Sequence, residues 1–134
     1  ESMGPLAKIA SGGELSRVML ALKTIFAQKE GVTSIIFDEV DTGVSGRVAQ
    51  AIADKIRLIA QHSQVLCITH LPQVAAVAQH HFLIKKSVHD DRTTTRVMPL
   101  KENDRVEELA RMLSGEKITQ LTKEHAQELL NMAK

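Results

Sequence analysis

The sequence predicts an α/β fold with a parallel strand–helix–strand core, followed by a β-hairpin and two C-terminal helices. Two short apolar runs rich in β-branched residues, 32–37 and 64–69, have the length of buried strands. The residues between them repeat apolar side chains at helical spacing, so a helix connects the two strands. A strand, a crossover helix and a second strand make a βαβ unit, whose strands are parallel.

Each helix of this first part is predicted from one apolar stripe. A helix over residues 11–29 precedes the first strand, because apolar side chains recur there at steps of three and four. Its stripe consists of Leu15, Val18, Met19, Leu22, Ile25 and Phe26. The stripe of the crossover helix consists of Val44, Val48, Ile52, Ile56 and Ile59. Both helices therefore present one face to a core.

The second part of the chain predicts a short helix and a hairpin. The helix is expected over residues 71–79, and the strands over 82–88 and 93–100. The polar segment His89-Asp90-Asp91-Arg92 separates the two strands, which makes an antiparallel hairpin the expected pairing.

Two helices close the chain. They are expected over residues 104–113 and 118–132, and Gly115 ends the first of them in the αL conformation. Their charged residues are interpreted as solvated faces, with Glu107 and Arg111 spaced as an i,i+4 ion pair.

Composition excludes several classes of protein. The hydrophobic share is 43% and the charged share 25%, so disorder is excluded, and no apolar run approaches the roughly 18 residues of a membrane span. The net charge of +1 gives no indication of a strongly charged partner, and the absence of Trp and Tyr argues against aromatic platforms for single-stranded nucleic acid. Cys67 is the single cysteine, so we expect a small core residue in a cytoplasmic protein.

The domain organisation is predicted to be simple. Residues 1–10 are expected to form a loose N-terminal segment, and the sequence leaves open whether residues 1–4 are native. Residues 11–134 are expected to form one lobe, because no repeat, low-complexity tract or linker interrupts them.

Ser11-Gly12-Gly13-Glu14 opens the first predicted helix. Ser11 and Glu14 have the spacing of a capping box, which is the ordinary structural interpretation. Two adjacent glycines are poor helix formers, and what they permit is close approach to the backbone. A helix N-terminus with bare N–H groups and a hydroxyl is well suited to bind phosphate.

Asp38 and Glu39 stand where the first apolar strand ends. Ligands of parallel α/β sheets bind beyond the carboxyl ends of the strands. Asp38 is a candidate ligand of Mg²⁺, and Glu39 is a candidate to orient an attacking water. The alternative is a strand that ends in a solvated acidic turn.

Two further candidates follow the strands. Asp41-Thr42-Gly43 is a turn that starts the crossover helix, and ordinary capping explains it when it is taken alone. His70 comes directly after the second strand. If the strands are neighbours, His70 emerges at the same edge as Asp38 and Glu39, where an imidazole can hydrogen-bond a terminal phosphate or the attacking water.

The order of these motifs resembles the second half of an ABC-type ATPase head. There, the Ser-Gly-Gly-Glu element is the signature motif, the Asp-Glu strand the Walker B motif, the Asp-Thr-Gly turn the D-loop, and the strand-end histidine the switch histidine. Residues 10–17, 36–46 and 69–75 are most similar to the SMC-like DNA repair group of this family, and the resemblance covers the chain from about Pro5 onward.

The resemblance implies a role for each position. Ser11, Gly12 and Gly13, with Glu14 in the same motif, would contact the γ-phosphate of ATP held by an opposite head. Asp41 would lie at the interface between the heads. Asp38 would serve Mg²⁺, Glu39 would be the catalytic carboxylate, and His70 would sense the γ-phosphate. Phosphoryl transfer depends mainly on positioning and electrostatic stabilisation, which agrees with these parts.

The resemblance also predicts missing parts. No Gly-x-x-x-x-Gly-Lys-Ser/Thr loop and no long heptad segment occur in these residues. The chain is therefore interpreted as the C-terminal lobe of a P-loop NTPase head, inactive alone. Its expected partners are the N-terminal half of the same head, a second head and DNA, with ATP and Mg²⁺ bound in the complete head dimer.

Two other functions stay open at this point. One is a non-catalytic module that dimerises through the same surface. The other is a metal-dependent hydrolase that uses Asp38, Glu39 and His70 with His80 or His81, although no Cys-x-x-Cys or His-x-x-x-His spacing occurs and this function leaves the two glycines unexplained.

Overall fold

The computed structural model describes residues 21, 34–38, 43–44, 46–115 and 117–134. The chain divides into two compact units, residues 1–74 and 75–134, and each unit is described by itself. Of the helix predicted over residues 11–29 only Ala21 is described, so that prediction lies outside the described residues.

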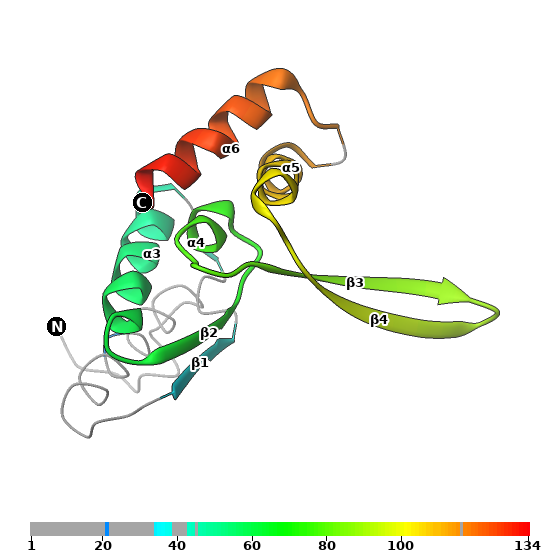
Figure 1. Ribbon diagram of the computed structural model, residues 1–134, viewed down its shortest axis with the longest axis horizontal. Coiled ribbons are helices and arrows are strands. Elements are labelled where there is room, and N and C mark those ends of the chain that lie inside the picture. The colour runs from blue at the N-terminus through cyan, green and yellow to red at the C-terminus, as the bar shows by residue number, and fades with distance from the viewer. Residues whose placement is uncertain (1–20, 22–33, 39–42, 45, 116) are drawn as a thin grey trace, which may run out of the picture. The chain divides into compact units, whose positions relative to one another are not determined.

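The first unit contains the predicted βαβ arrangement. Strand β1 (Ser34–Asp38) is followed by helix α3 (Gly46–Ala60) and strand β2 (Gln64–Ile68). The two strands lie side by side and parallel, in a register that runs from Ser34 opposite Gln64 to Asp38 opposite Ile68 (Figure 1). The parallel pairing predicted from the crossover helix is therefore confirmed.

Helix α3 buries one face, as its apolar spacing predicts. Five residues of this helix are buried, namely Ala49, Ile52, Ala53, Ile56 and Ile59. On β1, Ile35 and Phe37 alternate with exposed residues, and Phe37 is completely buried. Alternation places Ile35 and Phe37 on one face of the strand, and burial of such a side chain stabilises the fold by about 1.5–3 kcal/mol.

The other face of this sheet is exposed and apolar. Ile36, Leu66 and Ile68 have 59%, 54% and 46% of their surface accessible. The expectation of buried strands therefore holds only at alternate positions, because β1 buries every second residue and β2 alternates between exposed and partly buried residues. Cys67 is only partly buried, so it is less of a core residue than its composition-based interpretation indicated.

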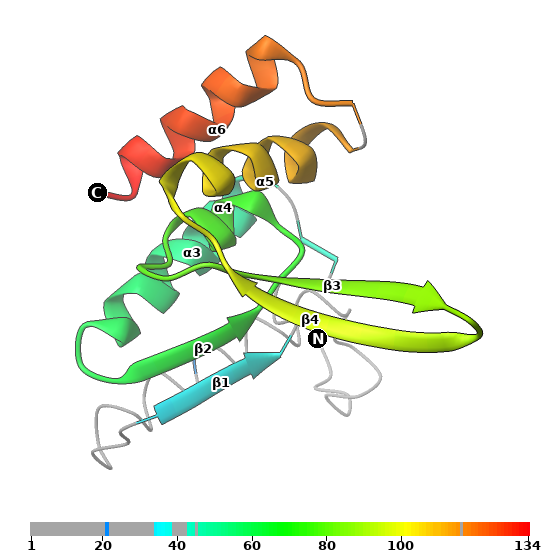
Figure 2. The ribbon, with the colours of Figure 1, turned by 45° about the vertical axis from the view of Figure 1, so that its right-hand side comes forward.

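The second unit begins with the end of helix α4 (Pro72–Ala76) and continues into the predicted hairpin. Strands β3 (Phe82–His89) and β4 (Arg92–Pro99) are antiparallel and extend as a long two-stranded ribbon (Figure 2). Helix α4 is shorter than the predicted range of 71–79, whereas the hairpin prediction is confirmed.

The hairpin turns through two residues that both have positive φ. Asp90 has φ 50° and Asp91 has φ 60°, and His89 pairs with Arg92 on either side of them. Two positive φ values are the requirement of a type I′ turn, whose twist matches that of the strands. An Asp-Asp pair tolerates positive φ better than most residue pairs, but less well than the Asn-Gly pair that type I′ turns favour.

Helices α5 (Glu102–Ser114) and α6 (Gln120–Met132) pack against each other and complete the second unit (Figure 2). Their shared core also includes the last residues of α4. The buried members are Ala75, Ala76, Leu109, Ala110, Ala126 and Leu130. Small alanines at four of these six positions let the helices approach closely around Leu109, which is completely buried.

The ends of these helices are well defined. Thr119 caps α6 in a reciprocal capping box with Thr122, in which the Thr119 hydroxyl accepts from the Thr122 N–H at 3.2 Å. Gly115 ends α5 as predicted, with its N–H donating to the Arg111 carbonyl at 2.7 Å. The predicted αL conformation is wrong, because Gly115 combines φ 77° with an extended ψ of −139°.

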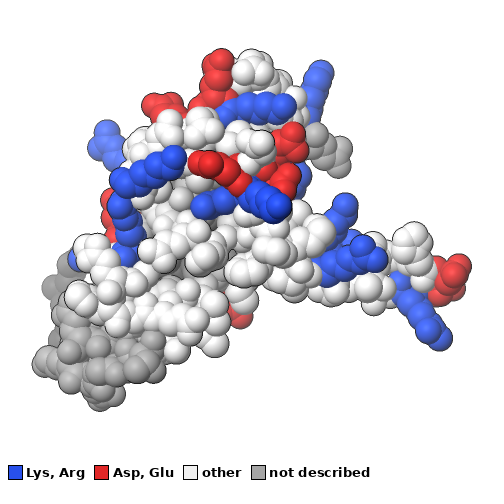
Figure 3. Space-filling view, in the orientation of Figure 1, with Lys and Arg blue, Asp and Glu red and all other residues white. Residues whose placement is uncertain are grey.

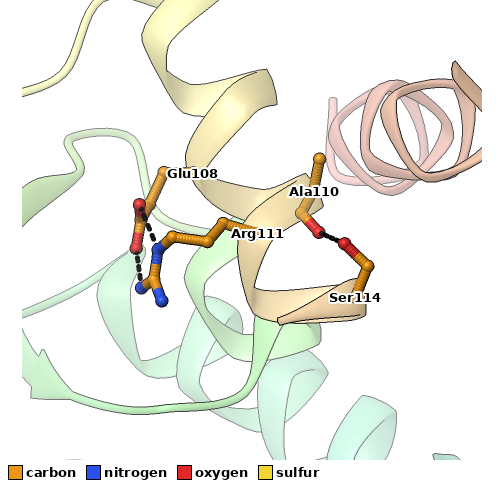
Figure 4. Close-up of polar contacts among 4 residues, drawn as sticks. All are labelled: Glu108, Ala110, Arg111 and Ser114. Atoms are coloured by element: carbon orange, nitrogen blue, oxygen red, sulfur yellow. Dashed lines mark hydrogen bonds and ion pairs between the residues drawn. The ribbon is translucent and has the colours of Figure 1, made fainter. Parts of the chain in front are cut away.

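Arg111 pairs with Glu108 and not with Glu107, so the predicted ion pair is wrong. The guanidinium donates through two nitrogens to both carboxylate oxygens of Glu108, and the Nε–Oε2 distance is 2.9 Å (Figure 4). Figure 4 also shows the Ser114 hydroxyl donating to the Ala110 carbonyl at 2.9 Å. Glu108 is 9% exposed, so this part of α5 is not the solvated face that the charge pattern indicated. The ion pair forms at i,i+3 because that carboxylate is the one turned toward the protein.

No helix among the described residues is both long and apolar enough to cross a membrane.

Candidate functional site

Asp38 and His70 lie at the same edge of the β1–β2 sheet. Asp38 is the last residue of β1 and is opposite Ile68, the last residue of β2, while His70 follows two residues later. Because the strands are parallel and adjacent, both side chains belong to the carboxyl edge of the sheet, where α/β proteins bind ligands. Asp38 and His70 are exposed, so both are accessible to a ligand.

A short bend holds His70 between the strand and the next helix. The Leu71 N–H donates to the Thr69 hydroxyl at 3.0 Å, which turns the chain immediately after β2. Pro72 then begins α4, where a missing N–H is tolerated and φ is already suitable for a helix. His70 is thus held on a bend between two fixed elements.

Gly43 lies in the segment that joins β1 to α3, and Gly46 is the first residue of α3. They have φ values of 74° and 57°, in the region that favours glycine. Gly43 lies in a turn, as predicted for the segment before the crossover helix. The remaining candidates, Ser11, Gly12, Gly13, Glu14, Glu39 and Asp41, lie outside the described residues.

The described donors fit a Mg²⁺ ion that is shared with a nucleotide better than an all-protein metal site. Within residues 34–38, 43–44, 46–115 and 117–134, no three His, Cys, Asp or Glu side chains are grouped so that they could hold a metal. Mg²⁺ usually takes one or two carboxylates and completes its shell with phosphates and water. One exposed carboxylate at the strand end, Asp38, suits that kind of site.

The histidines of the hydrolase alternative differ in their surroundings. His80 is exposed, whereas His81 is partly buried with its Nδ1 atom buried and without a hydrogen-bond partner. Burial lowers the pKa of His81, and the nearby Arg105 guanidinium lowers it further against the opposing effect of Glu108. Among the residues that the structure describes, His81 belongs to no group of side chains that could hold a metal.

The hairpin carries basic residues that the sequence analysis did not single out. Lys85, Lys86, Arg92 and Arg96 are all exposed on β3 and β4. The signal was present in the sequence, because a two-residue turn fixes which positions of the two strands share a face.

Comparison with known structures gives the class of fold. The chain is similar to a solved structure from work on the ATP-driven dimerization and DNA-stimulated activation of SMC ATPases, with a TM-score of 0.62, 22% identity, and coverage of 82% of this chain and 66% of that one. The fold is therefore that of an SMC-type ATPase head, a P-loop NTPase fold. No family model matches the sequence.

Comparison of sequences identifies the particular group. The chain is 65% identical to the DNA repair protein RecN of Halalkalibacterium halodurans and 63% identical to that of Bacillus subtilis, in each case over 99% of its length. It is 45% identical to RecN of Haemophilus influenzae over 96% of its length. The chain is a RecN-like sequence, and the resemblance to SMC-like repair proteins is confirmed.

The chain spans about a quarter of the length of these relatives, from 23% to 24%. What it does as part of a whole protein is therefore a matter for proposal.

Proposed function

We propose that this chain is the C-terminal part of the ATP-binding and ATP-hydrolysing head of a RecN-like SMC-family protein, which acts in DNA double-strand break repair and recombination. The observation that carries the proposal is the shared strand edge of Asp38 and His70, in a chain similar to RecN over almost its whole length. The position matches the edge where a P-loop NTPase binds its nucleotide.

Each of the three residues assigned to this edge has a separate role in ATP hydrolysis. Asp38 supplies a carboxylate to Mg²⁺, Glu39 accepts a proton from the attacking water and orients it, and His70 donates to the γ-phosphate. When bound, Mg²⁺ neutralises charge that develops on the phosphate oxygens. Each side chain acts by its position, because phosphoryl transfer needs little covalent chemistry from the protein.

We assign Ser11, Gly12 and Gly13, with Glu14, to the nucleotide of a second head, because the sequence predicts a helix N-terminus there. Backbone N–H groups and the Ser11 hydroxyl donate to the γ-phosphate there. Asp41 lies at the contact between the heads. ATP therefore joins two copies, and each copy completes the site of the other.

The complete head needs another part that holds the phosphate-cradling loop. The exposed apolar face formed by Ile36, Leu66 and Ile68 supports this, because an exposed apolar face of this kind marks a protein contact. We assign that contact to the N-terminal half of the same head. The whole protein acts in the cytoplasm, at the nucleoid, on DNA.

The test compares the isolated chain with the complete protein. The isolated chain has no measurable Mg²⁺-dependent ATPase activity, whereas the complete protein hydrolyses ATP. In the complete protein, Glu39→Gln lowers kcat at least about 100-fold, as expected for loss of a general base, while ATP binding stays close to wild type. Asp54→Asn, an exposed acid on α3, is the matched control and leaves kcat unchanged.

Three outcomes contradict the proposal. Clear turnover by the isolated chain shows that the missing loop is not required. Wild-type turnover by Glu39→Gln shows that another group activates water. Dimers of the complete head that form without nucleotide and tolerate Ser11→Arg indicate a non-catalytic dimerisation module instead.

A further inference from the structure

The β3–β4 hairpin has two chemically different faces. Residues directly opposite in an antiparallel pair share a face, and successive residues alternate between faces. One face carries four opposite pairs in the register, and the three pairs nearest the turn form what we call the basic face. These are Lys85 with Arg96, Ser87 with Thr94, and His89 with Arg92. The basic face therefore carries three permanent cations, two hydroxyls and an imidazole, and no carboxylate.

The reverse face of the hairpin is mainly apolar. Ile84 is opposite Val97, and Val88 is opposite Thr93. Ile84, Val88 and Val97 are 54%, 68% and 61% exposed, and Lys86 is the one cation on this face. A partner that contacts the basic face between residues 85 and 96 therefore meets polar groups, while Leu83 and Met98 continue the same face toward the base of the hairpin.

The cations of the basic face have no acidic partner in the part of the chain that the structure describes. Ion pairs there join Arg111 to Glu108 and Lys134 to Glu102, and none involves Lys85, Arg92 or Arg96. The two acids of the hairpin, Asp90 and Asp91, lie in its turn. Figure 3 shows basic side chains along the ribbon and acidic ones at its tip.

The strand register places two like charges directly opposite each other. Lys85 faces Arg96 directly, and such a pair destabilises an antiparallel ladder unless an anion lies against it. A phosphate between the two side chains turns the repulsion into two charge-assisted hydrogen bonds. The basic face is therefore arranged for a ligand with repeated negative charge.

We propose that the basic face of the β3–β4 hairpin binds the phosphate backbone of double-stranded DNA without reading its sequence. This inference rests on the proposed DNA repair function and assigns a surface to it. It corrects the impression given by a net charge of +1, because the fold gathers on one face cations that are dispersed in the sequence.

The spacing of the cations suits a nucleic-acid backbone. Arg92 and Arg96 are four residues apart on one strand, which is roughly 13–14 Å at about 3.4 Å per residue. A DNA strand advances by about 3.4 Å of helix axis per phosphate, so the length of the basic face corresponds to about four base-pair steps, and cations at its two ends can reach different phosphates. Ser87 and Thr94 lie between the cations, and hydroxyls are common donors to phosphate.

Duplex DNA fits this surface better than a single strand does. Single-strand sites stack bases on aromatic side chains, whereas the basic face has none and Phe82 belongs to the reverse face. The amide side chains that read adenine, Asn and Gln, are also absent from the hairpin, and we assign its cations to phosphates, so its contacts position DNA instead of selecting a sequence. A two-stranded ribbon is also narrow enough to enter a major groove.

The first experiment removes the cations in the complete protein. Lys85→Ala, Arg92→Ala and Arg96→Ala are combined, and binding to a blunt fluorescent 40-base-pair duplex is measured by anisotropy between 50 and 200 mM salt. Each lost phosphate contact lowers the slope of log K against log salt by about 0.9, so the slope falls by about 2–3. Lys86→Ala, on the reverse face of the same strand, is the control and leaves slope and affinity near wild type.

A second pair of variants adds charge without removing any group. Thr94→Lys adds a cation to the basic face and tightens binding at least about threefold, whereas Thr95→Lys, its neighbour on the reverse face, does not. These single changes at exposed positions keep the test usable if the triple variant folds poorly. ATPase activity without DNA is measured in every variant and stays at the wild-type rate.

Several results overturn the inference. A triple variant that binds with the wild-type slope excludes the basic face as the contact. Equal effects of the basic-face and reverse-face variants show that total charge matters and the face does not. Variants that aggregate but bind DNA normally show that the cations only keep an exposed hairpin soluble. Failure of the wild-type protein to bind any duplex overturns the DNA role itself, whereas normal wild-type binding with an unchanged triple variant overturns only this surface.

Discussion

Arg105 reaches back across 27 residues to the Ala78 carbonyl, which accepts from its guanidinium at 2.9 Å. The same nitrogen lies 3.3 Å from the Ala75 carbonyl and 3.4 Å from the Ala76 carbonyl. Ala75 and Ala76 are the last residues of α4 and Ala78 follows two residues later, in the region where a helix leaves carbonyl acceptors outside its own hydrogen-bond pattern. Arg105 therefore ties the start of α5 to the chain that leads out of α4.

Replacement of Arg105 is expected to destabilise the second unit. Arg105→Ala leaves three carbonyls without this donor and lowers the free energy of unfolding by about 2 kcal/mol, the usual range for hydrogen bonds from a charged group. Arg105→Lys restores only part of this, because an ammonium on a flexible stem lacks the planar fork of the guanidinium. Urea unfolding followed by circular dichroism measures the difference.

The control for this prediction is Lys101→Ala. Lys101 stands at the N-terminus of the same helix, is exposed and makes no side-chain capping bond. It should change stability by no more than about 0.5 kcal/mol. Equal losses from both variants would show that the bonds to the α4 carbonyls contribute nothing specific.

The two neighbouring glutamates of α5 are expected to differ sharply. Glu108→Ala removes the buried partner of Arg111 and costs about 1–2 kcal/mol, a value reduced because the Arg111 side chain is 53% exposed and therefore screened. Glu107→Ala removes an exposed side chain and changes stability by less than about 0.5 kcal/mol. Thermal unfolding of the two variants compares them directly, and a larger loss for Glu107→Ala would contradict the observed pairing.

The stability of the second unit is expected to fall in mild acid. Burial lowers the pKa of His81 in the folded state, so below about pH 6.5 the unfolded chain binds a proton that the native imidazole does not. The contribution of neutral His81 to stability is therefore fully present above about pH 6.5. This contribution is lost as the pH falls toward the pKa of His81 in the folded state. Thermal unfolding at pH 7.5 and 5.5 should show a smaller decrease in His81→Gln than in wild type.

The neighbouring His80 provides the comparison for that measurement. His80 is exposed, and His80→Gln removes an imidazole next to His81 without removing the buried one, so it is measured in parallel as the control. The prediction would be wrong if His80→Gln and His81→Gln reduced the acid sensitivity equally.

The hairpin turn can be improved. Asp91 has φ 60°, a region in which glycine has no steric penalty, so Asp91→Gly should stabilise the hairpin by about 0.5–1 kcal/mol. Asp90→Asn together with Asp91→Gly gives the sequence that type I′ turns favour most. Amide hydrogen exchange of β3 and β4 should slow in these variants, and faster exchange would show that the turn has another geometry.

Much of the fold follows from spacing alone. The helical repeat from Val44 to Ile59 and the β-branched runs on either side of it predict a parallel βαβ unit, and the structure contains one. The prediction was less accurate wherever tertiary contacts decide the outcome. Local spacing favoured Glu107 as the partner of Arg111, because an isolated helix cannot indicate which carboxylate its neighbours will bury.

The candidate site was predicted in part. The positions of Asp38 and His70 at one sheet edge follow from the strand ends and the parallel crossover. The exposed apolar face of the sheet could not be predicted from the same runs, because a short apolar segment reads alike whether one or both faces are covered. The charge segregation of the hairpin was readable only once its two-residue turn had fixed the register.

That turn has a consequence for how the hairpin tolerates insertions. A shift of β4 by one residue against β3 would turn every side chain of β4 to the opposite face of the ribbon, so Arg92 and Arg96 would join Ile84 and leave Lys85 alone. Inserting one amino acid into the turn would therefore mix basic and apolar side chains on both faces of the hairpin, although the residues of its two strands stay the same. We expect natural length variation to be absent between His89 and Arg92 wherever that sidedness is used.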